Sequence, residues 1–178
     1  MGGKEPGEGL VHVYTGDGKG KTTAALGLAM RACGHGFRVY MIQFMKGGWD
    51  YGELRVAEKL PNFTIRQFGR PTLVDKGKPS KIDVDLAREA LSHAKEVVGS
   101  GKYDIVILDE VNVALEWKLI ELSEVLEMIR EKPRSVELVL TGRYAPRELV
   151  EVADLVTEMR EVKHPYSRGI LARKGLGY

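Results

Sequence analysis

Apolar and polar positions along the chain follow two alternating periods. Short runs rich in β-branched and aromatic residues are each followed by a longer stretch in which small and aliphatic residues recur at helical spacing. The runs that predict strands cover residues 10–14, 39–44, 63–68, 104–108, 136–140 and 155–159. Strands that alternate with helices in this way imply a mostly parallel sheet with helices on both faces, which is an α/β fold.

Helical patterns lie between these runs. They cover Thr22–Ala32, Gly52–Leu60, Asp83–Gly99 and residues 122–129. A further helix is predicted to begin at Pro146. The pattern over Asp83–Gly99 is the clearest, because its apolar positions fall on one face: Ala87, Ala90, Leu91, Ala94, Val97 and Val98. The strand at 104–108 is instead continuously apolar, as strands buried on both faces are. Trp117 is expected to pack in the core.

The stretch from Gly69 to Lys81 is the most irregular part of the chain. It contains Pro71, Gly77 and Pro79 and shows neither period. Two interpretations are open: a mobile lid over a substrate, or a plain solvated connection.

Length and composition fit one domain. A chain of 178 residues that is 43% hydrophobic can bury a single core, and no break in composition marks a second one. We therefore expect one domain over residues 10–178, preceded by a flexible, glycine-rich tail at 1–9. A net charge of +2 is far from the concentrated positive charge of a nucleic-acid binder.

Cysteine content and targeting signals narrow the class further. The lone Cys33 excludes an intramolecular disulfide and a cysteine-based zinc site. Since the chain shows no signal peptide and no apolar run of membrane length, we expect a cytoplasmic protein that does not contact membranes.

A glycine-rich turn joins the first predicted strand to the first predicted helix. It reads Thr-Gly-Asp-Gly-Lys-Gly-Lys-Thr-Thr over residues 15–23. Its glycines let the backbone N–H groups point at phosphate oxygens, and the helix start adds the positive end of its dipole. Lys21 can add a mobile charge for the phosphates, and the Thr22 hydroxyl is suited to a magnesium ion.

The spacing of this turn departs from the common phosphate-binding loop. The usual pattern would place its first glycine at position 15, where this chain has Thr15. The loop is therefore tighter or differently threaded. A purely structural strand-to-helix connection is the alternative.

In a parallel sheet, ligands bind beyond the carboxyl ends of the strands. Polar or basic segments follow several predicted strands here, at 43–49, 109–110, 141–143 and 160–165. Asp109 and Glu110 come directly after the buried strand, where nucleotide triphosphatases carry an acid that holds magnesium directly or through water. The alternative is that the two acids cap the next helix.

The remaining candidates each have two interpretations. Arg143 can stabilise phosphate charge or pair with a nearby acid. His164 can contact a substrate or hydrogen-bond the backbone. Phe44 and Trp49 can line a pocket for a flat ligand, although an aromatic residue near a strand end is more often part of the core.

Together these segments resemble the ATP:corrinoid adenosyltransferases. The resemblance runs from Gly9 to Tyr178, and the short phosphate loop is the form that this family carries. The matching segments are 15–23, Arg31–Gly36, Gln43-Phe44, Lys46-Gly47, Gly52-Glu53, Leu108–Glu110, Thr141–Arg143 and Lys163–Pro165. The resemblance implies a recombinase-like, three-layer P-loop domain, usually a homodimer.

The same resemblance implies an activity. Such a transferase moves the 5′-deoxyadenosyl group of ATP to the cobalt(I) of a reduced corrinoid and releases triphosphate, in adenosylcobalamin biosynthesis or salvage. ATP would lie in the loop in reverse sense, so that C5′ faces the nucleophile. The acceptor would be cob(I)alamin or cobyrinic acid a,c-diamide, and a flavoprotein or another reductase would supply the electron.

The resemblance also implies roles for the residues at the matching positions. Lys21, Thr22 and Glu110 would be catalytic, with Lys21 neutralising the leaving group. Thr22 and Glu110, or Asp109 in place of Glu110, would hold Mg²⁺ or Mn²⁺. Corrinoid-side candidates are Phe44, Lys46, Trp49 and His164. The residues expected to bind ATP are Gly16, Asp17, Gly18, Lys19, Gly20, Lys21, Thr22, Thr23, Arg31 and Arg143.

The chain departs from family members at one place. It has Gly69-Arg70-Pro71-Thr72-Leu73 where members carry a Phe-Thr-Trp stretch that flanks the corrinoid.

Two other classes of protein are alternatives to the transferase. A generic P-loop ATPase or kinase would share the loop and the acidic pair, but it would release phosphate or a phosphorylated product. A nucleotide-sensing module would bind ATP without turnover.

Overall fold

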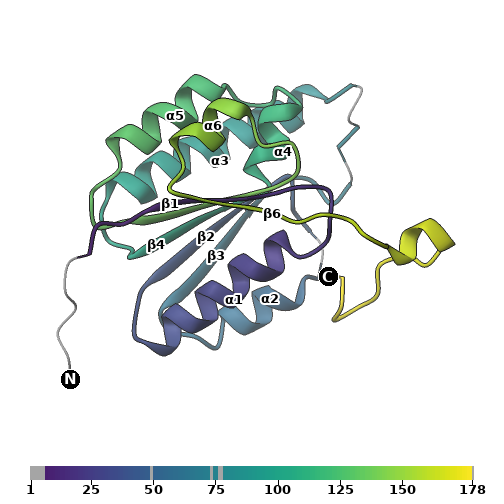
Figure 1. Ribbon diagram of the computed structural model, residues 1–178, viewed down its shortest axis with the longest axis horizontal. Coiled ribbons are helices and arrows are strands. Elements are labelled where there is room, and N and C mark those ends of the chain that lie inside the picture. Colours follow the sequence, from purple (N-terminus) through teal and green to yellow (C-terminus); the bar gives the residue numbers. More distant parts are fainter. Residues whose placement is uncertain (1–6, 49, 73, 76–77, 178) are drawn as a thin grey trace.

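The computed structural model describes residues 7–48, 50–72, 74–75 and 78–177. It is a three-layer α/β domain whose central sheet is 6-stranded, with the order β3-β2-β4-β5-β1-β6 and parallel pairing throughout (Figure 1). The strands are β1 (Val11–Thr15), β2 (Val39–Phe44), β3 (Phe63–Phe68), β4 (Ile105–Asp109), β5 (Glu137–Thr141) and β6 (Leu155–Glu158). The α/β fold predicted from the sequence is confirmed.

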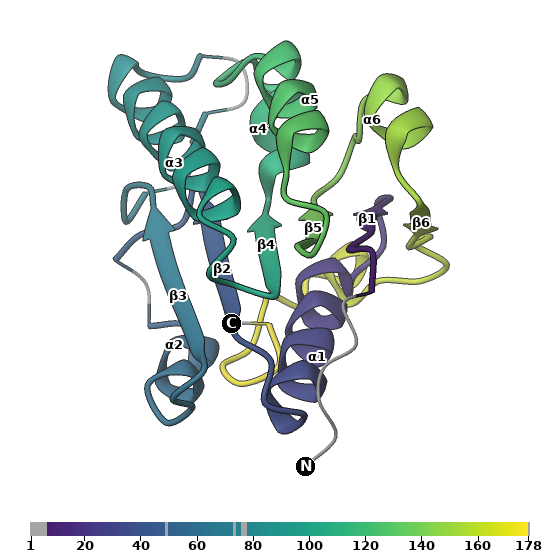
Figure 2. The same ribbon diagram turned by 90° about the vertical axis from the view of Figure 1, so that its left-hand side faces the viewer.

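Helices cover both faces of the sheet (Figure 2). α1 (Lys21–Gly34) and α2 (Gly52–Ala57) lie on one face. The other face carries α3 (Lys81–Gly99), α4 (Val111–Glu116), α5 (Leu122–Glu131) and α6 (Arg147–Val152). α4 and the short 3₁₀ helix Pro165–Arg168 were not predicted. Trp117, which follows α4, packs against the core as expected.

Burial explains the sequence pattern of the central strands. Every residue of β2 and β4 is buried, because helices cover both sides of these strands. On the α1 face the small side chains Ala25, Ala29 and Ala32 let the helix approach the sheet closely. On the opposite face α3 begins with a capping box, in which the Ser80 and Asp83 side chains bond each other's backbone N–H groups.

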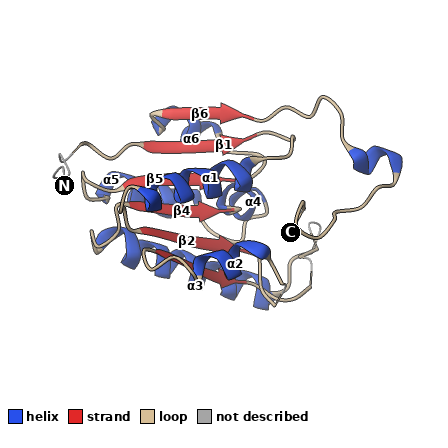
Figure 3. Ribbon diagram, turned by 90° about the horizontal axis from the view of Figure 1, so that it is seen from below, coloured by secondary structure: helices blue, strands red, loops and turns tan. Residues whose placement is uncertain are grey.

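The described chain is anchored to the domain at its start and leaves the domain body near its end. Gly9, the last residue of the predicted tail, donates its N–H to the Arg134 carbonyl over 2.6 Å and accepts a bond from Lys132, so it is anchored to the body. Beyond β6 the chain leaves the body, forms the 3₁₀ helix and returns toward α1 and α2 (Figures 1 and 3). No helix among the described residues is long and apolar enough to cross a membrane.

Candidate functional site

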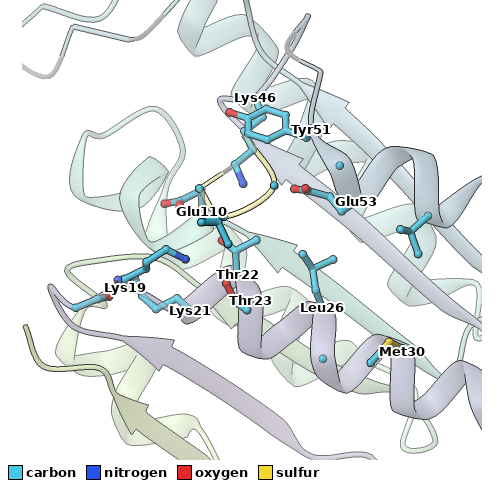
Figure 4. A pocket seen from close by; sticks show the side chains of 18 of the residues that line it. Lys19, Lys21, Thr22, Thr23, Leu26, Met30, Lys46, Tyr51, Glu53 and Glu110 are labelled. Atoms are coloured by element: carbon cyan, nitrogen blue, oxygen red, sulfur yellow. Dashed lines mark hydrogen bonds between the residues drawn. The ribbon is translucent and has the colours of Figure 1, made fainter. Parts of the chain in front are cut away.

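A cavity of about 890 Å³ opens beyond the carboxyl ends of the strands and continues between α1 and α2 (Figure 4). One end is polar and is lined by the loop Gly18–Thr23 with charged side chains from the neighbouring strand ends. The other end is apolar and is lined by Leu26, Met30, Val56, Leu60, Phe63 and Leu176. The volume lies within the range of roughly 300–1,000 Å³ that is typical of ligand pockets.

The phosphate loop is shaped by the segment that follows β6. Gly16 and Gly20 have φ of +93° and +122°, which side-chain-bearing residues rarely adopt. A Cβ atom at Gly16 would lie 2.5 Å from the Met159 carbonyl oxygen, and one at Gly18 would lie 2.7 Å from the same oxygen. Gly18 also donates its N–H to that oxygen over 2.6 Å. The glycines therefore allow the loop to pack directly against the chain leaving β6.

Lys21 lies inside this loop. Its ammonium donates to the carbonyl oxygens of Gly16 and Gly18, both at 2.7 Å. Burial lowers the pKa of Lys21 and the nearby Arg143 lowers it further, while Glu110 and Asp17 act in the opposite direction. Lys21 thus brings a positive charge to the polar end of the cavity.

Asp109 is fully buried at the end of β4 and accepts hydrogen bonds from four neighbours. Thr141 Oγ1 and Thr22 Oγ1 donate to its Oδ1 over 2.6 and 2.8 Å. Lys46 Nζ and Gln43 Nε2 donate to its Oδ2 over 2.7 and 3.1 Å. A carboxylate has about four acceptor sites, so Asp109 is saturated by protein groups. Its role in this arrangement is to hold Thr22 and Lys46 in place.

Glu110, in contrast, lines the cavity. Its φ of 64° is left-handed, which is uncommon for a residue with a side chain. Burial raises the pKa of its carboxyl and the neighbouring Asp109 raises it further, whereas Lys46, Lys21 and Arg143 oppose the shift. Glu110 occupies the N-cap position of α4, but its side chain makes no capping bond. The carboxylate is therefore available to the cavity.

The residues present fit a divalent ion of the magnesium type. Thr22 and Glu110 line the same end of the cavity and offer hard oxygen ligands (Figure 4). The described residues include no group of three or more His, Cys, Asp or Glu side chains that could hold a metal by themselves. Magnesium commonly binds through one or two protein ligands together with substrate phosphates, so this donor set suits an ion that arrives with a nucleotide.

The structure brings most of the predicted site residues together. Those that line the cavity are Gly18, Lys19, Gly20, Lys21, Thr22, Thr23, Lys46, Glu110, Arg143 and His164. His164 also matches its alternative interpretation, because its Nδ1 accepts a bond from the Tyr166 N–H over 3.1 Å.

Other predicted residues lie elsewhere. Gly16 and Asp17 are on the side of the loop that faces the segment after β6, and the Glu161 N–H bonded to Asp17 lowers the pKa of that carboxyl. Arg31 is exposed in the last turn of α1 and does not line the cavity. Phe44 is fully buried in the core, so the cavity role expected as one alternative does not apply to it. Trp49 lies outside the described residues.

Besides the apolar side chains of α1, α2 and β3 that line the cavity, three parts of the site were missed from the sequence. Tyr51 lies under the Lys46 ammonium, with its ring centroid 5.1 Å from Nζ, and lines the cavity. Glu53 accepts a bond from Gln43 Nε2 over 3.1 Å and lines it as well. The third part is the C-terminal turn, of which Gly175, Leu176 and Gly177 line the cavity. Gly52-Glu53 had been noted as a matching segment, but nothing in the sequence signalled the C-terminal turn.

Comparisons with known proteins show which family the chain resembles. The profile of the family described as "ATP:corrinoid adenosyltransferase BtuR/CobO/CobP" matches residues 7–178. A corrinoid adenosyltransferase of Escherichia coli (strain K12) is 37% identical over 170 residues, which cover 96% of this chain and 86% of the relative. One of Sinorhizobium sp is 38% identical and covers 96% and 81% of the two chains. One of Salmonella typhimurium is 34% identical and covers 96% and 86%.

Proposed function

The chain belongs to the ATP:corrinoid adenosyltransferase family, and we propose that it transfers the 5′-deoxyadenosyl group of ATP to the cobalt(I) of a reduced corrinoid and releases triphosphate. The enzyme is accordingly a transferase. The observation that carries the proposal is the single cavity in which the cationic loop with Lys21 faces Glu110, and which extends well beyond the loop along α1 and α2.

The polar end of the cavity supports the proposed binding of triphosphate. The loop offers backbone N–H groups at the start of α1, and Lys19, Lys21 and Arg143 bring positive charge to the same end. In the proposed reaction the triphosphate leaves with additional negative charge. Preorganised cations at this position stabilise that charge as it develops.

A divalent ion would be held by Thr22 and Glu110, and it would neutralise part of the triphosphate charge when bound. Asp109 accepts the Thr22 hydroxyl proton in a hydrogen bond, which turns the lone pairs of that oxygen away from Asp109 and toward the cavity. Mg²⁺ is the expected ion, with Mn²⁺ as the alternative.

In the proposed reaction the protein needs only to position C5′ of ATP and to stabilise the negative charge of the leaving triphosphate. The electron pair of the cobalt(I) substrate forms the new bond to C5′ while the bond from C5′ to the triphosphate oxygen breaks, and the pair from that bond leaves on the triphosphate. The reaction requires no general base, because the nucleophile carries no proton. We propose that ATP lies in the loop with C5′, and not the terminal phosphorus, toward the acceptor.

The acceptor side is proposed to include Lys46 and His164, which line the cavity. Cob(I)alamin and cobyrinic acid a,c-diamide are the candidate acceptors. A reductase as electron donor, a homodimeric assembly and a cytoplasmic location stay predictions from the family resemblance.

The test is an anaerobic mixture of the protein, magnesium, ATP and chemically reduced cobalamin, followed by visible absorption. Formation of the light-sensitive adenosyl product, dependent on both ATP and protein, is expected. Phosphate release with an unchanged corrinoid spectrum would instead assign the chain to the P-loop ATPases. ATP binding without any turnover would assign it to nucleotide sensors.

A further inference from the structure

The apolar end of the cavity is lined by side chains that are unusually open to solvent. Met30 of α1 is 66% exposed, Val56 of α2 is 50% exposed, and Leu176 of the C-terminal turn is 62% exposed. All three line the same cavity as the phosphate loop. Apolar side chains that gather in a hollow and stay exposed are typical of a ligand-binding surface.

The C-terminal turn, residues 173–177, is held by its own backbone hydrogen bonds, and the chain returns to the cavity there after leaving the domain body. The N–H groups of Leu176 and Gly177 both donate to the Arg173 carbonyl, over 3.0 and 2.8 Å. Gly175 has a φ of +76°, which suits glycine. A Cβ atom at Gly177 would lie 2.9 Å from the Ala172 Cβ, so the turn is also tightly folded on itself.

Among the described residues, an ion pair links this turn to the segment before α2. Lys174 Nζ lies 3.7 Å from Asp50 Oδ2, in the segment between β2 and α2. Both side chains are more than half exposed, and such pairs contribute little stability. The same Asp50 oxygen accepts a closer bond from Arg55 over 2.6 Å, so the contact of Lys174 with it is a weak one that can break when a ligand enters.

The position of the apolar end relative to the loop identifies the part of the ligand that it receives. α1 runs from Lys21, in the loop, to Met30, so the cavity extends about 14 Å along this helix from the polar end. ATP has a similar division, with a charged triphosphate joined through the ribose to a flat base whose two faces pack on apolar side chains. With the triphosphate in the loop, the apolar end lies within reach of the nucleoside.

We propose that the C-terminal turn Arg173–Gly177 is a wall of the nucleoside end of the ATP site, and that Leu176 contacts the base. This inference rests on the proposed function, because it needs ATP in the phosphate loop. Leu176 is thus a residue that contacts ATP directly, and the turn closes on the ligand in the cavity that α1 and α2 also line.

Calorimetric titration without corrinoid tests the contact. Leu176→Ser should weaken the binding of magnesium-ATP about fivefold, as expected for the loss of a partly buried leucine contact. It should leave the binding of inorganic magnesium-triphosphate unchanged. Leu171→Ser is the matched control, because Leu171 lies in the same segment, is 71% exposed and does not line the cavity. This control should bind both ligands like the wild type.

Limited digestion with trypsin tests the closure on the unmodified protein. Magnesium-ATP should slow cleavage after Lys174, which the mass of the truncated chain identifies, while cleavage after the exposed Arg168 continues at its original rate. Magnesium-triphosphate should give no such protection. Equal rates after Lys174 with and without ATP would overturn the proposal.

Failure of this inference can be told from failure of the proposed function. If the wild type does not bind magnesium-ATP, both fail. If it binds ATP and the Leu176 and Leu171 variants bind equally well, only the inference fails. A Leu176→Ser variant with normal ATP affinity and a raised KM for the corrinoid would also overturn it, since the turn would then belong to the acceptor side.

Discussion

Replacing Lys46 with methionine removes a charge and keeps most of the side-chain volume. In the folded protein the Lys46 side chain is 15% exposed and its ammonium lies 2.7 Å from the fully buried Asp109 carboxylate. The substitution therefore leaves a buried carboxylate without its ionic partner. Because the remaining donors, Thr22, Thr141 and Gln43, are all neutral, they compensate only in part.

The expected cost follows from this geometry. Removing one partner of a buried ion pair costs about 3–5 kcal/mol. Because Asp109 keeps its neutral hydrogen bonds, the expected loss in the free energy of unfolding lies at the lower end of this range, about 3 kcal/mol. For a chain of this size such a loss lowers Tm by about 6–12 °C. Burial lowers the pKa of Lys46, but the charge and hydrogen bond of Asp109 outweigh it and leave this pKa raised. A raised lysine pKa means that the contribution is lost only in strongly alkaline solution, so the cost should be constant from about pH 6 to pH 9.

A double-mutant cycle measured by urea unfolding without nucleotide is the assay. Lys46→Met, Asp109→Asn and the combined variant should show a coupling free energy of at least about 1 kcal/mol, because the asparagine no longer leaves a buried charge. Lys95→Met is the control: its pair with Glu124 has a similar length, 2.9 Å, but the side chains are 36% and 44% exposed. That change should cost at most about 1 kcal/mol. Additive single effects, or equal costs at Lys46 and Lys95, would refute the reasoning.

Three further predictions concern the loop, the metal and the loop after β3. Lys21→Ala should lower turnover by about 10²–10³-fold or more at saturating ATP, since one preorganised charge on the leaving group is lost; retained turnover would contradict this role. Glu110→Ala should abolish most of the gain in ATP affinity that magnesium gives, by calorimetry with and without the metal, and unchanged binding would exclude Glu110 as a ligand of the ion. Burial raises the pKa of Asp83, but hydrogen bonds from Arg70 and Ser80 outweigh this effect and leave the pKa lowered. The stability lost in Asp83→Asn should therefore be largest near neutral pH and shrink as the pH falls below about 4. A loss independent of pH would exclude the ion pair as its cause.

The sequence predicted those elements whose pattern is local. Strands β2 and β4 are continuous apolar runs, and the phosphate loop is one contiguous segment. α4 was missed because Val111–Leu115 is buried throughout, so it has no polar face and no helical period. The Asp109 network could not be predicted, since it depends on the order β2-β4-β5, which brings Gln43 and Thr141 to opposite sides of one carboxylate.

The part of the site that forms where the chain comes back to the domain could not be predicted from the sequence either. The turn at Gly175–Gly177 reaches the cavity only because the chain leaves the body after β6 and comes back. Phe44 illustrates a different limit: a strand-end aromatic has the same local pattern in a core as in a pocket, and only the packing of α3 against β2 settles that it is buried.

The measurement that tests the account most directly is the fate of γ-labelled ATP in the anaerobic reaction with reduced cobalamin. Attack at C5′ predicts that the label is recovered in intact triphosphate, with one triphosphate for each adenosylated corrinoid, and that neither product forms when ATP or the protein is omitted. Recovery of the label as orthophosphate before any corrinoid is adenosylated would contradict the account and place the reaction at the terminal phosphorus.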